Sequence, residues 1–183
     1  MIFAKSPRSA SIQQAKEIVE VTRKYGERSA PINMVPELER LKADRLSTKL
    51  WYTRMQDYLQ KTTLRRPLVV GVFQGQTVEE MNDIVQQTGI DIAQLHGEES
   101  VADLEGVTIP CIKVLHMSPS GGAGDSNVAD KLKHDIELFS GKAVAILLDS
   151  RVPGKIPPFI LQYLLQRKGL FAFVLLLLIV IMR

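Results

Sequence analysis

The chain has 183 residues, enough for one domain of ordinary size or for one domain with an appendage. Hydrophobic residues make up 45% of it and charged residues 23%, which excludes a predominantly disordered chain. A single cysteine excludes a disulfide framework and a thiolate zinc cluster.

The net charge of +3 hides an uneven distribution along the chain. Residues 1–66 carry 14 Lys and Arg against 7 Asp and Glu, whereas residues 67–154 carry 5 against 13. Two explanations stay open: a basic surface for nucleic acid or membrane, or helix-surface charge that pairs within one fold. Trp51, Tyr52 and Tyr58 stand at helical spacings that suit core packing better than base stacking, so nucleic acid is not an expected partner.

The first third of the chain is predicted to be mainly helical. Residues 1–4 are a short apolar strand, and Ser11 is expected to cap a helix that ends before Gly26. Residues 32–66 form a helical insertion whose irregular apolar spacing accommodates one helix or two.

From residue 67 onward, strands and helices alternate. Residues 68–73, 90–95, 109–115 and 143–148 are apolar runs typical of strands buried on both faces. A capping box at Thr77 and Glu80, a cap at Ser100 and apolar spacing over residues 128–139 predict the intervening helices. The pattern indicates an α/β fold, either an open doubly wound sheet or a (βα)8 barrel. No G-x-G-x-x-G follows a strand, which weakens the dinucleotide-binding form of the first.

Polar side chains follow the predicted strands, at the ends where barrel enzymes build active sites. Asp149 is either a loop cap or a general acid, and His96 is either structural or functional. Arg8 is either a solvated charge or a ligand for a carboxylate or phosphate. The remaining members of this set are Gln74 and His116.

No metal site is predicted. His116 and His134 are not spaced with each other or with His96 as a local metal motif, so we expect neither to be functional. Cys111 lies inside a predicted strand and is expected to be a small core residue.

The end of the chain is strongly apolar. Residues 170–182 are 13 consecutive apolar residues, whereas a membrane-spanning helix needs about 20. We therefore expect residues 155–183 to be an apolar helical tail, with membrane contact through residues 159–182 as one alternative. No signal peptide is expected, because Lys5 and Arg8 follow the opening apolar residues at once.

Four segments together resemble the phosphoribosylanthranilate isomerase family in its fungal form, over roughly residues 2–154. They are Ile2-Phe3-Ala4-Lys5-Ser6-Pro7-Arg8, Pro67-Leu68-Val69-Val70-Gly71-Val72-Phe73-Gln74, Ile90-Asp91-Ile92-Ala93-Gln94-Leu95-His96-Gly97-Glu98-Glu99 and Leu147-Leu148-Asp149-Ser150. The resemblance implies a partial (βα)8 barrel over residues 1–154, with about five of the eight strands and without cofactor or metal. It also implies an Amadori rearrangement of N-(5′-phosphoribosyl)anthranilate to the corresponding ketose.

The resemblance also implies roles for individual residues. Asp149 matches the general acid, Arg8 matches the arginine that binds the anthranilate carboxylate, and His96 matches the histidine of the Gln-Leu-His-Gly motif. The family's base is a cysteine in a Lys-x-Cys-Gly segment that this sequence lacks, and Cys111 is not its equivalent. The family's glycine-rich continuation into the phosphate site is not matched after Gly154.

These matches favour a cytoplasmic isomerase of tryptophan biosynthesis, with a small phosphorylated substrate. In fungi such a domain is commonly part of a multifunctional polypeptide. The alternative is an inactive, truncated or membrane-associated remnant with no catalytic role.

Overall fold

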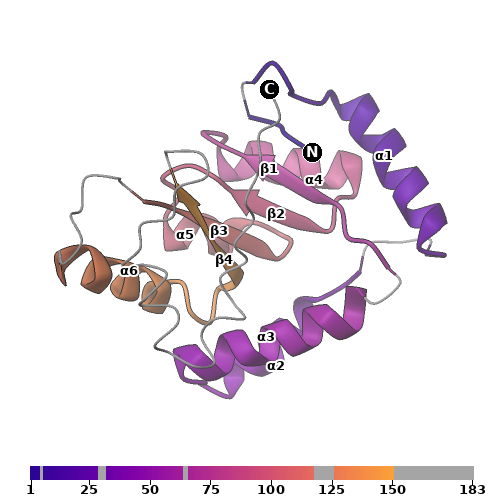
Figure 1. Cartoon of the computed structure of the whole chain (residues 1–183). Coiled ribbons are helices and arrows are strands. Elements are labelled where there is room, and N and C mark those ends of the chain that lie inside the picture. The colour runs from indigo at the N-terminus through magenta and orange to yellow at the C-terminus, as the bar shows by residue number, and fades with distance from the viewer. Residues whose placement is uncertain (5, 29–31, 64–65, 118–125, 151–183) are drawn as a thin grey trace.

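The computed structural model describes residues 1–4, 6–28, 32–63, 66–117 and 126–150 (Figure 1). This part of the chain alternates helices and strands after an opening set of three helices. In chain order the elements are α1 (Ile12–Tyr25), α2 (Val35–Ala43), α3 (Thr48–Thr63), β1 (Val70–Phe73), α4 (Val78–Thr88), β2 (Ile92–Leu95), α5 (Val101–Gly106), β3 (Cys111–Met117), α6 (Ser126–Leu138) and β4 (Ala143–Ser150).

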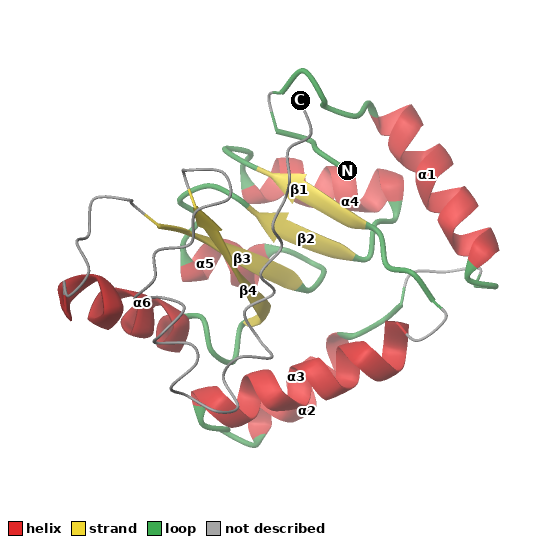
Figure 2. Ribbon diagram, in the orientation of Figure 1, coloured by secondary structure: helices red, strands yellow, loops and turns green. Residues whose placement is uncertain are grey.

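The four strands form one parallel sheet in the order β1-β2-β3-β4, which confirms the predicted α/β class (Figure 2). The strand predicted over residues 1–4 is reduced to a single parallel bridge between Ile2 and Val72. Its backbone still bonds the edge of β1, with Phe3 N donating to Val72 O at 2.8 Å and Val72 N donating to Met1 O at 2.7 Å. The opening segment therefore lies along the free edge of β1.

Local signals in the sequence set the ends of the helices. Capping boxes begin α1 at Ser11 and α4 at Thr77, and a third begins α5 at Ser100. Gly89 follows α4 with a φ of 69°, in the left-handed region that glycine adopts at little cost. These helix boundaries agree with those predicted from the sequence.

The main core lies between one face of the sheet and the helices that follow its strands. In the view of Figure 1, α4 and α5 lie behind the sheet. Because side chains alternate along a strand, the odd-numbered positions of β1 to β3 point to this face, together with Ile146 and Leu148 of β4, which pair with Lys113 and Leu115. Its buried members include Phe73, Ala93, Leu95, Cys111, Ile146 and Leu148 from the strands and Met81, Val85, Leu104, Leu132 and Ile136 from the helices. The opposite face carries the even-numbered positions of β1, β2 and β3. On β4 it carries their register partners, which are Ala145, Leu147 and Asp149.

The predicted insertion folds as two helices, α2 and α3, which lie below the sheet in Figure 1. Trp51 of α3 is 1% exposed, and its Nε1 donates to the carbonyl of Ala143 at 2.9 Å. Tyr52 is also buried, and its hydroxyl donates to the carbonyl of Ile136 at 3.4 Å. These aromatic residues belong to the core, as their spacing predicts, and α3 covers the amino end of β4.

Asp91, directly before β2, holds both ends of this insertion against the sheet. The Arg28 guanidinium donates to its two oxygens at 2.7 and 2.6 Å, and the two side chains are only 7% and 1% exposed. The same carboxylate accepts the backbone N–H of Ile32 at 3.2 Å and of Val69 at 2.8 Å. Four hydrogen bonds thus fill the acceptor sites of a buried carboxylate.

The apolar tail and the Gly121-Gly122-Ala123-Gly124 loop lie outside the described residues. None of the helices that the structure describes is both long enough and apolar enough to span a membrane.

The Asp91 contacts predict a large loss of stability on mutation. Asp91→Ala leaves the Arg28 guanidinium buried without its carboxylate, so the free energy of unfolding is expected to fall by about 3 to 5 kcal/mol. Urea denaturation followed by the fluorescence of Trp51, the one tryptophan of the chain, measures this loss. The matched control is Glu137→Ala, which removes an exposed pair with Lys133 at 3.9 Å and should cost less than about 1 kcal/mol. Equal losses in the two variants would contradict the role of Asp91.

Candidate active site

The carboxyl ends of β3 and β4 extend two residues beyond the predicted strands. His116 and Asp149 therefore lie within the sheet ladder instead of following it, and they are direct register partners. Polar side chains end an apolar run in the sequence, but they do not interrupt backbone pairing. Register partners in a parallel sheet point to the same face, so the imidazole and the carboxylate meet.

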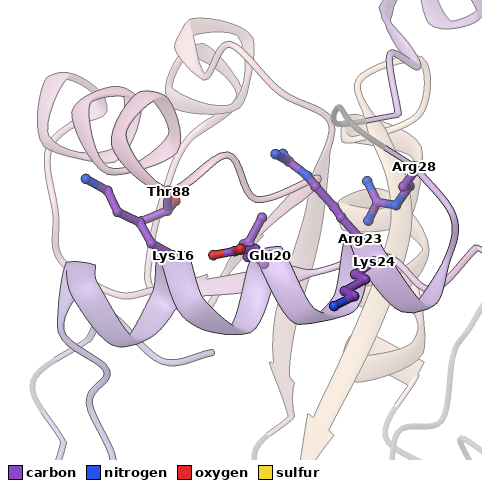
Figure 3. A pocket seen from close by; sticks show the side chains of 7 residues that line it. Lys16, Glu20, Arg23, Lys24, Arg28 and Thr88 are labelled. Atoms are coloured by element: carbon purple, nitrogen blue, oxygen red, sulfur yellow. The ribbon is translucent and has the colours of Figure 1, made fainter.

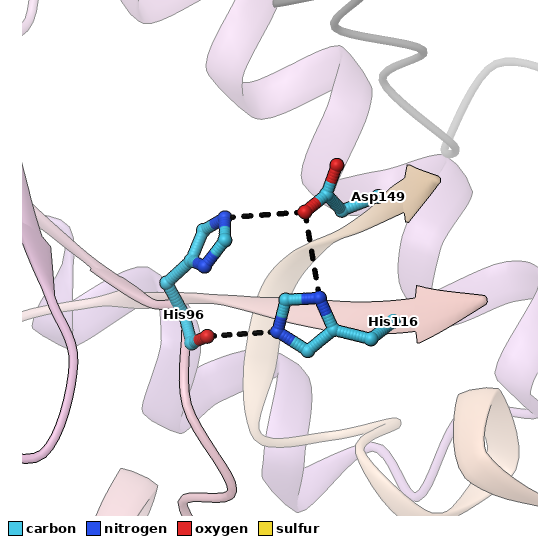
Figure 4. A group of neighbouring side chains, drawn as sticks. All are labelled: His96, His116 and Asp149. Atoms are coloured by element: carbon cyan, nitrogen blue, oxygen red, sulfur yellow. Dashed lines mark hydrogen bonds and ion pairs between the residues drawn. The ribbon is translucent and has the colours of Figure 1, made fainter. Parts of the chain in front are cut away.

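His96 joins these two residues from the end of β2. Its backbone N–H donates to the carbonyl of Phe73 at 2.9 Å, which continues the pairing of β1 and β2 by one residue. Its own carbonyl lies 2.8 Å from Nε2 of His116 (Figure 4). Since a carbonyl oxygen only accepts, Nε2 of His116 carries the proton of this hydrogen bond.

His96, His116 and Asp149 form the strand-end cluster. Oδ2 of Asp149 lies 3.5 Å from Nε2 of His96 and 3.4 Å from Nδ1 of His116 (Figure 4). The two imidazole rings meet edge to face, with centroids 4.9 Å apart. The side chains of His96, His116 and Asp149 are 24%, 21% and 39% exposed, so a small molecule can reach all three.

A buried ion pair fixes the loop that carries His96. Lys113 of β3 points to the helix-covered face, where its ammonium donates to the carbonyl of Gly97 at 2.6 Å and to Glu99 at 2.8 Å. The Glu99 carboxylate in turn accepts the backbone N–H of Gly97 at 3.0 and 2.9 Å. Two side chains of β3 that point to opposite faces of the sheet thus bond successive carbonyls of this loop: His116 bonds that of His96, and Lys113 bonds that of Gly97. This double attachment positions His96 beside Asp149.

Gln94 lies on the same sheet face as the cluster, two residues before His96. The residue is 5% exposed, and its Nε2 has no hydrogen-bond partner among the described residues. A buried amide donor without a partner is costly, so this nitrogen is available to a water or a ligand at the site.

The structure brings together two of the three predicted site residues. His96 and Asp149 belong to the cluster, whereas Arg8 is exposed and no described ion pair joins it to Asp149. His116, for which the sequence predicts no functional role, contacts both His96 and Asp149, and the absence of a role stays a prediction. Its position just past a predicted strand was the signal that pointed to it. His134 is exposed on α6, away from this strand end.

Cys111 is a core residue, as predicted. It is 2% exposed, on the helix-covered face near the start of β3. Burial, with a smaller contribution from the charge of Glu99, raises the pKa of its thiol from 9.0 to about 12. The thiol therefore stays protonated near neutral pH and is not a candidate base.

A separate cavity of about 430 Å³ lies between α1 and the end of α4 (Figure 3). Its charged lining residues are Lys16, Glu20, Arg23, Lys24 and Arg28. Arg23 and Arg28 bond Gly89 and Asp91 at the amino end of β2, the opposite end from His96. The cavity is therefore not part of the strand-end cluster.

The fold and this cluster define an α/β protein with an acid–base group at the carboxyl ends of parallel strands, the place where barrel enzymes carry their active sites. A model of the N-(5′-phosphoribosyl)anthranilate (PRA) isomerase family matches residues 10–150. The chain belongs to that family.

Two relatives agree with this assignment. The chain is 35% identical over 82% of its length to a tryptophan biosynthesis protein TRP1 from Phytophthora nicotianae. It is 32% identical over 84% of its length to a multifunctional tryptophan biosynthesis protein from Phycomyces blakesleeanus. It spans only 27% and 18% of those two proteins.

The fold is similar to that of a phosphoribosyl anthranilate isomerase solved in complex with reduced 1-(o-carboxyphenylamino)-1-deoxyribulose 5-phosphate. The TM-score is 0.50 at 19% identity, over 90% of this chain and 57% of that one. This similarity supports the barrel-type arrangement of the strands and helices.

The buried thiol gives a prediction on pH dependence. Because the pKa of Cys111 is raised in the folded chain, the folded state retains a proton that the unfolded state releases between pH 9.0 and about 12. Stability contributed by the neutral thiol is therefore complete below pH 9.0 and is lost as pH rises through that window. Urea denaturation at several pH values should show a steeper loss for the natural chain than for Cys111→Ala. The same slope in both chains would exclude this contribution.

Proposed function

We propose that the chain carries the acid half of a phosphoribosylanthranilate isomerase site, with Asp149 as the general acid. The observation that carries the proposal is the Asp149 carboxyl group at the end of β4, within 3.5 Å of two imidazoles, in a chain of this family. Asp149 would protonate the ribose ring oxygen of N-(5′-phosphoribosyl)anthranilate, and the ring would open to an iminium. Removal of the C2′ proton then gives the enolamine that becomes the ketose.

Arg8 and His96 are the proposed substrate-binding residues. A guanidinium binds a carboxylate through two parallel hydrogen bonds, so Arg8 suits the anthranilate carboxylate. His96 lies beside the acid, where its ring can contact the sugar. Gln94 adds a buried amide donor on the same face.

The base and the phosphate site are proposed to come from sequence beyond these residues. The chain has no Lys-x-Cys-Gly segment, and its one cysteine is the buried Cys111. The relatives are much longer, and one is named as multifunctional, so a larger cytoplasmic polypeptide of tryptophan biosynthesis is the proposed context.

Binding of anthranilate tests the proposed site directly. The chain has only three histidines, so their ring-proton NMR signals distinguish the cluster from the rest of the molecule. Anthranilate should shift the signals of His96 and His116 and leave that of the exposed His134 unchanged. Arg8→Ala should weaken binding about tenfold, the value of one charge-assisted hydrogen-bonding pair, whereas the exposed Arg54→Ala should not. Equal shifts of all three histidines would count against the site.

Turnover tests the division of the active site. Residues 1–183, purified from a host that lacks its own isomerase, should convert N-(5′-phosphoribosyl)anthranilate no faster than the Asp149→Asn variant does. The reason is that an acid without its base leaves the proton on C2′ in place. Conversion at a rate near that of a complete isomerase, lost in Asp149→Asn, would show that these residues already contain the base.

A further inference from the structure

The hydrogen bond of His116 leaves a lone pair facing a carboxylate. Nε2 carries the proton that bonds the carbonyl of His96, so in the neutral ring Nδ1 has no proton. Nδ1 nevertheless points at Oδ2 of Asp149, 3.4 Å away (Figure 4). Two electron-rich atoms at this distance repel each other unless a proton or a metal ion lies between them.

The distances favour a metal ion over a proton as that charge. An N–H···O hydrogen bond spans about 2.7 to 3.2 Å, shorter than the 3.4 and 3.5 Å from Oδ2 of Asp149 to the two imidazole nitrogens. In a tetrahedral site with metal–ligand bonds of about 2.1 Å, neighbouring ligand atoms lie about 3.4 Å apart. The donor atoms of all three side chains lie within 4.8 Å of one another, a grouping that could hold one ion.

The surroundings of the cluster are also those of a metal site. Metal-binding histidines commonly donate their second ring N–H to a carbonyl or carboxylate, which fixes the tautomer and the ring orientation. His116 makes this bond to the backbone of His96, and Lys113 holds the next carbonyl of the same loop. The exposed edge of the cluster leaves room for a water or another ligand in a fourth position.

We propose that His96, His116 and Asp149 bind one first-row divalent ion of the Zn²⁺ or Co²⁺ class. Two imidazoles and one carboxylate are a donor set that such ions prefer over Mg²⁺ or Ca²⁺. The ion would occupy the space beside His96, His116 and Asp149 that anthranilate and the substrate's ribose ring take under the proposed function, so it would act as an inhibitor and not as a cofactor. This inhibitory consequence rests on the proposed function, whereas the binding of the ion does not.

The test uses Co²⁺ with the full chain, free of any affinity tag. Four-coordinate Co²⁺ absorbs visible light far more strongly than the hydrated ion, so titration reports both the affinity and the geometry. His116→Ala should weaken Co²⁺ binding by about 100-fold or more, and His134→Ala should leave it unchanged. The far-UV circular dichroism of both variants shows whether each remains folded.

A second measurement needs no variant. Zn²⁺ should shift the ring-proton signals of His96 and His116 and not that of His134, and anthranilate should no longer bind. If Zn²⁺ shifts the signals of His96 and His116 but anthranilate binds as before, the metal site is supported and its inhibitory role is overturned. Absorption like that of hydrated Co²⁺, or equal weakening by His134→Ala, would overturn the metal site itself.

Discussion

The in-register parallel pairing of β2, β3 and β4 is the constraint on which the candidate site depends. Parallel strands end at one edge of a sheet, and residues paired across them share a face. This register places His116 opposite Asp149 and leaves His96 at the end of the neighbouring strand. A shift of β4 by one residue would turn Asp149 to the helix-covered face in place of Ile146 and Leu148, and would bury its carboxylate in the apolar core.

The opposite end of the sheet carries stabilising contacts instead of chemistry. Asp91 and Arg28 form a buried pair before β2, and Trp51 bonds the carbonyl of Ala143 at the start of β4. Among the described residues, α3 bonds the start of β4 through Trp51 and the carbonyl of Ile136 on α6 through Tyr52. These contacts add core at the end of β4 away from Asp149. This separation is the one expected of barrel enzymes, in which one end of the strands serves stability and the other serves catalysis.

Much of the fold could be predicted because its signals are local. A capping residue and its partner stand three positions apart, as Thr77 and Glu80 do, and a strand of a buried parallel sheet is a short apolar run. The ends of β3 and β4 were misplaced because His116 and Asp149 are polar, although backbone pairing continues through both. A pattern of side chains does not report hydrogen bonds between backbones.

The long-range contacts could not be predicted from the sequence alone. Arg28 and Asp91 are 63 residues apart, and nothing near either residue indicates the other. The sequence places His116 just past a strand, but no local motif indicates its contact with Asp149 on the next strand. His96 and Asp149 were found partly from their positions after apolar runs and partly from the family resemblance. Without that resemblance, their roles stayed open.

The strand-end cluster suits positive charge, and this property connects the two proposals. An aspartate between two imidazoles, one with its lone pair fixed toward the carboxylate, would attract a cation at the point where Asp149 would act. Under the proposed function, ring opening converts the uncharged amine nitrogen of the substrate into a cationic iminium close to that point. Donor atoms already oriented toward a positive charge would stabilise this intermediate more than the substrate, which lowers the barrier to its formation. Affinity for a divalent ion is then a consequence of the same arrangement. A cluster that bound the iminium more strongly would also bind an inhibitory ion more tightly, and this limits how strongly the site can favour the iminium.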